Sequence, residues 1–221
     1  MDIKGKNIIV TGGSLGIGKE TALNLIEKGA NVLVTGRSIE RLKKPFNNSS
    51  VKFLEFDIGD IPNIVDNAKK CLELLDNRVD ILINNAGTGF RRSLDELKIE
   101  DFLEVYNTNV FGLSLFTKEI VPIMKNQKSG TIINIGSTAS LKGYATGSIY
   151  SSSKFAVRCL SQCWQAELRP FNIRVCQVNP SEVTTAFANP ERVERDEVHN
   201  KLTPKEISHA IISAIEMDDR G

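Results

Sequence analysis

The chain has 221 residues, which suffices for one large α/β domain or at most two small ones. It carries 28 Lys and Arg residues against 27 Asp and Glu, and the net charge of +1 argues against binding to nucleic acid or to an anionic membrane surface. The two histidines, His199 and His209, lack the spacing of metal ligands, so we expect neither a metal site nor a histidine base. This composition favours a small molecule as the partner.

No signal for export or membrane insertion stands out in the sequence. Residues 1–6 lack an apolar signal region, and no apolar run approaches the about 18 residues of a membrane span. The four cysteines form no Cys-x-x-Cys pair, and Cys159 and Cys163 lie one helical turn apart in an apolar face, so we expect core thiols in a reducing compartment, with Cys71 and Cys176 as the other two. These features predict a soluble, cytoplasmic protein.

A glycine-rich turn follows the first predicted strand. The apolar run Ile8-Ile9-Val10 suits a strand buried on both faces of a parallel sheet, and helical spacing begins after Thr11-Gly12-Gly13-Ser14-Leu15-Gly16-Ile17-Gly18. Glycines in such a turn let the backbone approach an anion, whose phosphates would contact the unpaired N–H groups at the start of the helix. The stretch predicts a pyrophosphate site, with an ordinary glycine-rich loop as the alternative.

The second predicted strand, residues 31–35, ends at Gly36-Arg37-Ser38. In a dinucleotide fold, an acid about 20 residues beyond the glycines would bind the adenosine ribose hydroxyls. Here Arg37 stands in that region instead, and a guanidinium offers several donors to a 2′-phosphate. This favours NADP over NAD, although a solvated arginine after a strand is the alternative.

Polar and small residues also follow the next two predicted strands. Residues 51–56 end at Asp57, and residues 79–83 lead into Asn84-Asn85-Ala86-Gly87, which lets the backbone approach a ligand at the carboxyl end of a parallel strand. A helix from about residue 61 to 75 separates them, and another from about 99 to 125 follows. Asn109 falls inside that helix, where it either points to solvent or marks a local kink whose freed backbone groups hold a water.

Tyr150 and Lys154 lie four residues apart at the start of a predicted helix, after a fifth strand at residues 131–135. This spacing puts both side chains on one helical face, where the ammonium would lower the pKa of the phenol toward neutrality. Ser137, at the end of the fifth strand, would hydrogen-bond a substrate oxygen that faces the phenol. Tyr-x-x-x-Lys pairs also arise by chance on many helices.

The last third of the chain contains a sixth strand, residues 174–178, followed by Asn179-Pro180-Ser181. Residues 186–201 are charged with few apolar anchors, which fits a mobile lid and a solvated loop equally well. Thr203, Pro204 and Glu206 then have the spacing of a capped helix start. Six strands that alternate with helices predict a single domain over residues 1–221, with a doubly wound parallel sheet and helices on both faces.

Together these motifs resemble the short-chain dehydrogenase/reductase family over nearly the whole chain. The motifs are Thr11-Gly12-x-x-x-Gly16-x-Gly18, Asn84-Asn85-Ala86-Gly87, Asn109, Ser137 and Tyr150-x-x-x-Lys154, in the family's order and at its intervals. The resemblance implies a Rossmann-type domain that binds a nicotinamide dinucleotide at the strand ends. Contacts to it are implied at Gly12, Ser14, Gly16, Ile17, Gly18, Arg37, Ser38, Asp57, Ile58, Asn85, Ala86, Gly87, Tyr150, Lys154, Pro180, Val183 and Thr185.

The resemblance also implies catalytic roles. Tyr150 would be the general acid in carbonyl reduction and the base in alcohol oxidation, while Lys154 would lower its pKa and bind the nicotinamide ribose. Ser137 would orient the substrate oxygen, and Asn109 would anchor a water that relays protons. Asp57 would contact the adenine, and Val183 and Thr185 the nicotinamide carboxamide.

Two features depart from the family pattern. Ser181 replaces the glycine that usually follows Pro180, and the family's seventh strand does not follow the last helix before Gly221, either because the chain is shortened there or because the protein lacks that strand. That strand often packs between subunits, which leaves the helices starting near Ile99 and Tyr150 as the expected contacts of a homodimer or homotetramer.

We therefore expect an NADP(H)-dependent oxidoreductase that moves a hydride between the nicotinamide and a carbonyl or alcohol substrate, with NAD(H) less favoured. A 3-oxoacyl-thioester (acyl-carrier-protein) reductase is a more specific possibility by family analogy. A non-catalytic protein that senses NADP(H) is the alternative from another class. Substrate specificity would lie in residues 88–95, 138–149 and 186–201.

Overall fold

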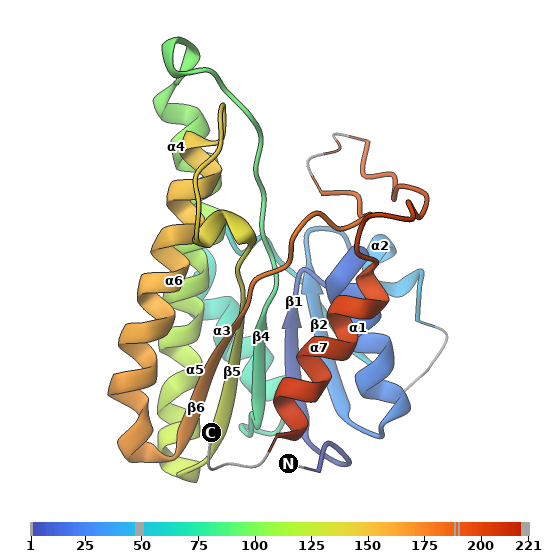
Figure 1. Ribbon diagram of the computed structural model, residues 1–221. Coiled ribbons are helices and arrows are strands. Elements are labelled where there is room, and N and C mark those ends of the chain that lie inside the picture. The colour runs from blue at the N-terminus through green and yellow to red at the C-terminus, as the bar shows by residue number, and fades with distance from the viewer. Residues whose placement is uncertain (1, 47–50, 188, 190, 218–221) are drawn as a thin grey trace.

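The computed structural model describes residues 2–46, 51–187, 189 and 191–217. Six parallel strands form one sheet in the order β3-β2-β1-β4-β5-β6 (Figure 1). The strands are β1 (Asn7–Thr11), β2 (Asn31–Gly36), β3 (Lys52–Glu55), β4 (Ile81–Asn84), β5 (Gly130–Ile135) and β6 (Ile173–Val178). The chain reverses its direction of winding between β3 and β4, so the central pair is β1 with β4. The predicted doubly wound parallel sheet in a single domain is confirmed.

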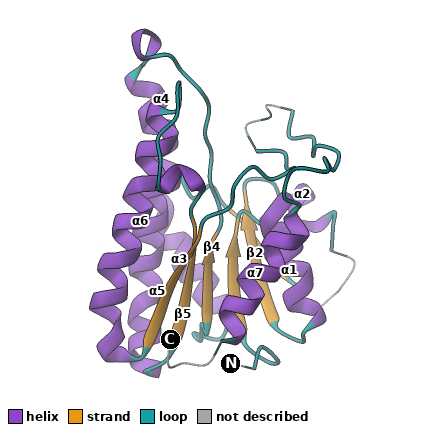
Figure 2. Ribbon diagram, in the orientation of Figure 1, coloured by secondary structure: helices purple, strands orange, loops and turns teal. Residues whose placement is uncertain are grey.

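Helices cover both faces of the sheet, as Figure 2 shows. On one face lie α1 (Gly16–Glu27), α2 (Ile39–Lys43) and α7 (Pro204–Glu216), and on the other α3 (Ile64–Leu74), α4 (Ile99–Tyr106), α5 (Leu113–Gln127) and α6 (Ser148–Leu168). Short 3-10 helices span Ile61–Asn63, Leu94–Glu96, Thr138–Ser140 and Arg169–Phe171. Helix α2 was not expected from the sequence.

Alternate residues of each strand enter two separate cores. Ile8 and Val10 of β1 pack with α1 and α7, whereas Ile9 faces α3 and α5, and all three are fully buried. A strand that supplies both cores has no polar face, which explains the unbroken apolar run.

The long predicted helix from residue 99 onward is broken in the middle. Residues Asn107–Gly112 form a π-helical segment between α4 and α5. A Cβ atom on Gly112 would overlap the carbonyl oxygen of Ile58, so the segment approaches the chain after β3 closely. Asn109 is fully buried here and does not point to solvent. Of the two expected alternatives, a solvent-facing side chain or a local kink, the structure therefore has the local irregularity.

The start of α7 is as predicted. The hydroxyl of Thr203 accepts a hydrogen bond from the backbone N–H of Glu206, and the Glu206 carboxylate accepts one from the backbone N–H of Thr203 at 2.7 Å. This reciprocal cap orients α7 along α1, with which it packs side by side (Figure 1).

The expectation of four core cysteines is wrong for two of them. Cys71 is buried and Cys176 is half-buried, but Cys159 and Cys163 are exposed on α6. Helix α6 turns Lys154, Val157 and its other buried side chains toward the sheet, and the two thiols lie on the opposite face of the helix.

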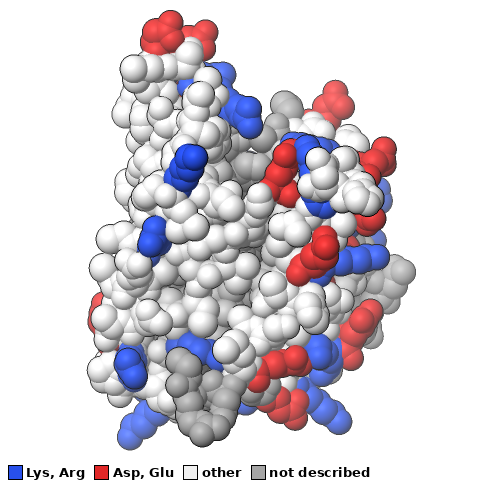
Figure 3. Space-filling view, viewed as in Figure 1, with Lys and Arg blue, Asp and Glu red and all other residues white. Residues whose placement is uncertain are grey.

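Charges of both signs are interspersed over the right half of the surface in Figure 3, whereas the left half, over α5 and α6, carries few. Among the described residues, none of the helices has both the length and the apolar character needed to cross a membrane.

Candidate active site

A cleft of about 790 Å³ lies where the six strands end. Each strand is followed by a lining residue, and these are Gly12, Arg37, Asp57, Asn85, Ser137 and Pro180. This volume and position suit a bound small molecule, because parallel sheets bind ligands outside the carboxyl ends of their strands.

The cleft brings together nearly all the predicted site residues. Those that line it are Gly12, Ser14, Gly16, Ile17, Arg37, Ser38, Asp57, Ile58, Asn85, Ala86, Gly87, Ser137, Tyr150, Lys154, Pro180, Val183 and Thr185. Gly18 and Asn109 are not among its lining residues.

The glycine-rich turn has the backbone that its sequence predicts. Gly12 and Gly16 adopt φ angles of +67° and +56°, which residues other than glycine rarely adopt. A Cβ on Gly18 would overlap the Asn85 amide and the Gly12 carbonyl oxygen, so Gly18 permits close packing behind the cleft. The Asn85 amide donates to the backbone oxygens of Thr11 and Gly12 at 2.9 Å each, and this ties the turn after β1 to the end of β4.

Two arginines line the end of the cleft beside β2. Arg37 follows the strand directly, and Arg41 lies one turn into α2, whose N-cap is Ser38. The Ser38 hydroxyl accepts from the backbone N–H of Arg41 at 3.3 Å. Arg41 was not predicted as a site residue, because the five-residue helix that carries it was not recognised; Ser38 with an acidic residue in the first turn was the available signal.

Tyr150, Ser137 and Lys154 meet at the opposite end of the cleft. The Tyr150 ring packs on Phe187 with centroids 5.4 Å apart, and its hydroxyl is hydrogen-bonded with Ser137. Lys154 is only 4% exposed, and its ammonium donates to the backbone oxygen of Ile135 at 2.8 Å. The three side chains come from α6 and the turn after β5, which places a phenol, a hydroxyl and an ammonium together.

The expected lowering of the Tyr150 pKa is not what this arrangement produces. Burial raises the pKa of Tyr150 to about 12, although the hydrogen bond with Ser137 opposes the rise. Burial also lowers the pKa of Lys154 to about 8. The Lys154 nitrogen lies 5.8 Å from the centre of the Tyr150 ring and donates to Ile135, and burial has the largest influence on the pKa of Tyr150.

Asn109 is placed behind the reacting end. Its side-chain oxygen accepts from the backbone N–H of Thr88 at 2.9 Å, and its amide donates to the Thr88 oxygen and to the Ser153 hydroxyl. These bonds fix the segment after β4 against α6. A Cβ on Gly87 would lie 3.3 Å from the Asn109 oxygen and 3.7 Å from the Lys154 nitrogen, so the three residues are close neighbours.

The three segments expected to set specificity all reach the cleft. They contribute Thr88, Gly89, Phe90 and Arg91, then Thr138, Ala139, Lys142, Gly143 and Tyr144, and then Ala186, Phe187, Arg192 and Arg195. Ser181 and Glu182 also line it.

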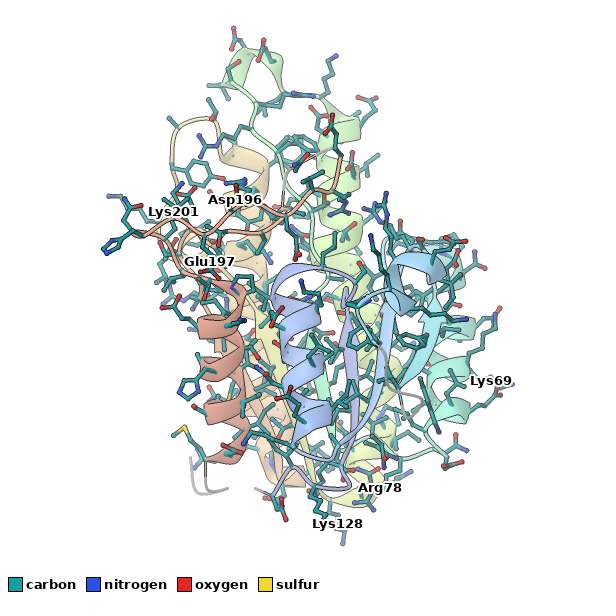
Figure 4. All side chains as sticks on the ribbon, turned by 90° about the vertical axis from the view of Figure 1, so that its right-hand side faces the viewer. Lys69, Arg78, Lys128, Asp196, Glu197 and Lys201 are labelled. Carbon is teal, nitrogen blue, oxygen red and sulfur yellow. The ribbon has the colours of Figure 1, made fainter. Side chains whose placement is uncertain are left out.

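The charged loop at 186–201 contacts the glycine-rich turn; residues 188 and 190 lie outside the described residues. The Glu194 carboxylate accepts from the backbone N–H of Gly16 at 2.7 Å and from the Lys19 ammonium at 2.8 Å. Figure 4 shows the neighbouring Asp196, Glu197 and Lys201 on this loop above α1 and α7, far from Arg78 and Lys128 at the other end of the molecule.

Comparison with known proteins identifies the family. The family model described as short chain dehydrogenase matches residues 6–196. The NADP-dependent 3-hydroxy acid dehydrogenase of Schizosaccharomyces pombe is 32% identical, over 96% of this chain and 88% of that protein. The 3-ketodihydrosphingosine reductase of Bacteroides thetaiotaomicron is 36% identical over 82% of this chain, but the match spans only 65% of the reductase.

Solved structures agree with this result. The structure of an alcohol dehydrogenase from the archaeon Thermococcus sibiricus, complexed with 5-hydroxy-NADP, superposes with a TM-score of 0.89 at 26% identity, covering 99% of this chain and 93% of that one. The chain belongs to the short-chain dehydrogenase family, whose members are oxidoreductases that use a nicotinamide cofactor.

Proposed function

We propose that the protein is an NADP(H)-dependent oxidoreductase that moves a hydride between the nicotinamide and a carbonyl or alcohol substrate. The observation that carries this proposal is that one cleft joins the glycine-rich turn, Arg37 and the Tyr150–Ser137 pair. A cradle for phosphates and an acid–base group are thereby available to one bound molecule and its reaction partner.

The chain's own residues supply the proton and the orientation of the substrate. The bound cofactor supplies or accepts the hydride at its nicotinamide ring. With a pKa raised to about 12, Tyr150 holds its proton at neutral pH and can donate it to a carbonyl oxygen during reduction. Ser137 can hydrogen-bond that same oxygen, because it already contacts the phenol.

Lys154 and Asn109 support Tyr150 and Ser137 without donating a proton to the substrate themselves. The Lys154 ammonium, buried and tied to Ile135, contributes positive charge below the phenol, where it stabilises the phenolate that forms as the proton leaves. Asn109 holds Thr88 and Ser153 through hydrogen bonds, so we assign it a positioning role. A water bound beside Asn109 that relays protons remains part of the same proposal.

The preference for NADP over NAD rests on Arg37, to which the structure adds Arg41. Both guanidiniums are exposed and line the cleft beside β2, where Arg37 rather than an acid directly follows the strand. Two cations there favour a 2′-phosphate over a pair of ribose hydroxyls. The NADP of one relative's name and of one neighbour's complex supports the same cofactor.

The relatives guide the choice of first substrates. One is named for 3-hydroxy acids and another for 3-ketodihydrosphingosine, so compounds with an oxygen on the third carbon are the first to test.

We also propose a cytoplasmic homodimer or homotetramer. All four cysteines are free thiols, which suits a reducing compartment. Apolar side chains of α4, the π-helical segment, α5 and α6 are exposed, namely Leu103, Phe111, Leu115 and Phe155.

The acid–base role is tested with Tyr150→Phe. We expect NADPH consumption with a carbonyl substrate to fall at least about 100-fold, because the variant has no proton to donate. NADPH binding, followed by the fluorescence of the nicotinamide, serves as the control for an intact cleft. A variant that retains the wild-type rate would contradict the proposal.

A further inference from the structure

The charges around the reacting end of the cleft are strongly biased. Besides the buried Lys154, four cationic residues of the flanking segments line the cleft: Arg91, Lys142, Arg192 and Arg195. Among the described lining residues the acids are Asp57, which follows edge strand β3 at the far end, and Glu182.

The negative charge of Glu182 is already offset by neighbouring cations. It forms ion pairs with Lys201 and, at 3.6 Å, with Arg195, and these cations lower its pKa together with the more distant Arg91. No ion pair of the described residues involves Arg91, Lys142 or Arg192. The cleft around Tyr150 therefore has an excess of positive charge near the aromatic rings of Tyr144, Tyr150 and Phe187.

Arg91 reaches the surroundings of Tyr150 through the ring of Tyr144. Its guanidinium lies 5.4 Å from the centre of the Tyr144 ring, and the Tyr144 hydroxyl is near enough to Tyr150 to raise its pKa further. Two residues before Arg91, a Cβ on Gly89 would overlap the Tyr150 ring, so this segment passes directly along the phenol.

We infer that the substrate carries an anionic group, a carboxylate in the simplest case, and that Arg91 binds this group while Tyr150 faces the reacting oxygen. The inference rests on the proposed function and narrows its substrate class. A guanidinium on an aromatic ring is fixed in orientation and can accept a carboxylate with two parallel hydrogen bonds.

The test compares a 3-hydroxy acid with its methyl ester as substrates of the oxidation, in the wild type and in Arg91→Gln. We expect Arg91→Gln to lower kcat/KM for the acid on the order of 10- to 100-fold, as the loss of a charged hydrogen-bonding partner would, and to change that for the ester less than about threefold. Arg92→Gln is the matched control, because Arg92 pairs with Asp101 at 3.0 Å and does not line the cleft.

The outcomes separate this inference from the proposed function. An equal loss for acid and ester, or a wild type that oxidises neutral alcohols but no hydroxy acid, overturns the inference and leaves the proposed function standing. A wild type that reduces NADP⁺ with neither kind of alcohol overturns both.

The contact of Glu194 carries a second inference independently. Its carboxylate occupies a donor of the α1 N-terminus, the Gly16 N–H, and is also paired with Lys19. Although burial alone would raise the pKa of Glu194, the hydrogen bonds from Lys19 and Gly16 hold it below its usual value, so the group is an anion at neutral pH. An internal carboxylate thus stands at the turn where a dinucleotide phosphate would bind.

We infer that Glu194 competes with the cofactor's phosphates, so that binding the dinucleotide releases the loop around Glu194 from the turn. The negative charges of the two groups repel each other, and the Gly16 N–H can serve only one of them fully. Cofactor affinity is then set in part by the cost of breaking this contact.

Glu194→Gln keeps the shape and removes the charge. We expect it to bind NADPH about three- to tenfold more tightly, whereas Glu197→Gln, which removes the same charge from an exposed position on the loop, leaves binding unchanged. In the wild type, saturating NADPH should speed tryptic cleavage after Arg192 and Arg195. Weaker or unchanged binding by Glu194→Gln, or NADPH protection of these two sites, overturns the inference.

Discussion

At the scale of single residues, the buried ammonium of Lys154 links the site to stability. Its pKa of about 8 lies below the ordinary value of 10.5, so between these values the unfolded chain holds a proton that the folded chain has released. The contribution of Lys154 to the free energy of unfolding therefore rises with pH across this window, by about 1.4 kcal/mol per pH unit.

Lys154→Met tests this assignment. The variant should lose the rise, so that the difference in unfolding free energy between wild type and variant changes steadily through the window. Urea denaturation of both proteins at pH values on either side of it measures the difference. Groups such as Cys71, whose pKa burial raises to about 12, contribute equally to both proteins and cancel. A constant difference would show that Lys154 is not desolvated as the structure has it.

We propose that Arg37 sets the preference for NADP(H). We expect Arg37→Ala to weaken NADPH binding about 10- to 100-fold and NADH binding far less, because the guanidinium would hydrogen-bond a phosphate that only NADPH carries. Lys44→Ala is the control, since Lys44 is an exposed cation near the same strand outside the cleft lining. Equal weakening for the two cofactors would remove the role given to Arg37.

The sequence predicts which residues form the cleft better than it predicts their protonation. Residues such as Asp57, Asn85 and Ser137 immediately follow buried strands, and parallel strands end at a common edge, so their proximity follows from the chain order. The pKa of Tyr150 depends instead on burial, to which Phe187 contributes from a segment far along the chain. No local pattern reports that packing.

At the scale of elements, the π-helical segment is the least replaceable part of the scaffold. Gly112→Ala would normally favour a helix, but here the added methyl group meets the backbone oxygen of Ile58, which cannot rotate away as a side chain could. We expect a loss of about 2 kcal/mol or more in the free energy of unfolding, measured with urea. In Gly143→Ala, where a Cβ has no neighbour within 4 Å, the change should be within about 0.5 kcal/mol.

A wild-type stability for Gly112→Ala would mean that α5 and the chain after β3 separate easily. The π-helical segment could not be predicted from the sequence. Residues 99 to 125 have a continuous helical pattern, and only Asn109 hints at an interruption. The extra residue in the turn coincides with tertiary hydrogen bonds of Asn109 to Thr88 and Ser153, which no local pattern encodes. In contrast, the cap of α7 needs only residues 203 to 206, and it was predicted correctly.

At the scale of the whole molecule, the exposed apolar side chains of α4, α5 and α6 should be covered by a second copy. Phe155→Glu places a charge in the middle of α6, on its exposed face, and is expected to shift the protein toward a monomer. Light scattering after size-exclusion chromatography measures the mass. Val65→Glu changes an exposed residue of α3 and should leave the mass unchanged. An unaltered mass in Phe155→Glu would exclude α6 from the interface.

The bridge between the end of β4 and the turn after β1 has a consequence for how the molecule is assembled. Strands β1 to β3 and strands β4 to β6 are each continuous in the chain, and they join only along the pair of β1 with β4, where Asn85 and Thr11 are bonded. The left-handed backbone at Asp76 and Asn77 marks the surface turn between the halves. If the chain were divided at this turn, each of the two polypeptides would carry about half of the ligand's contacts. The cleft would form only when the two associate through the pairing of β1 with β4.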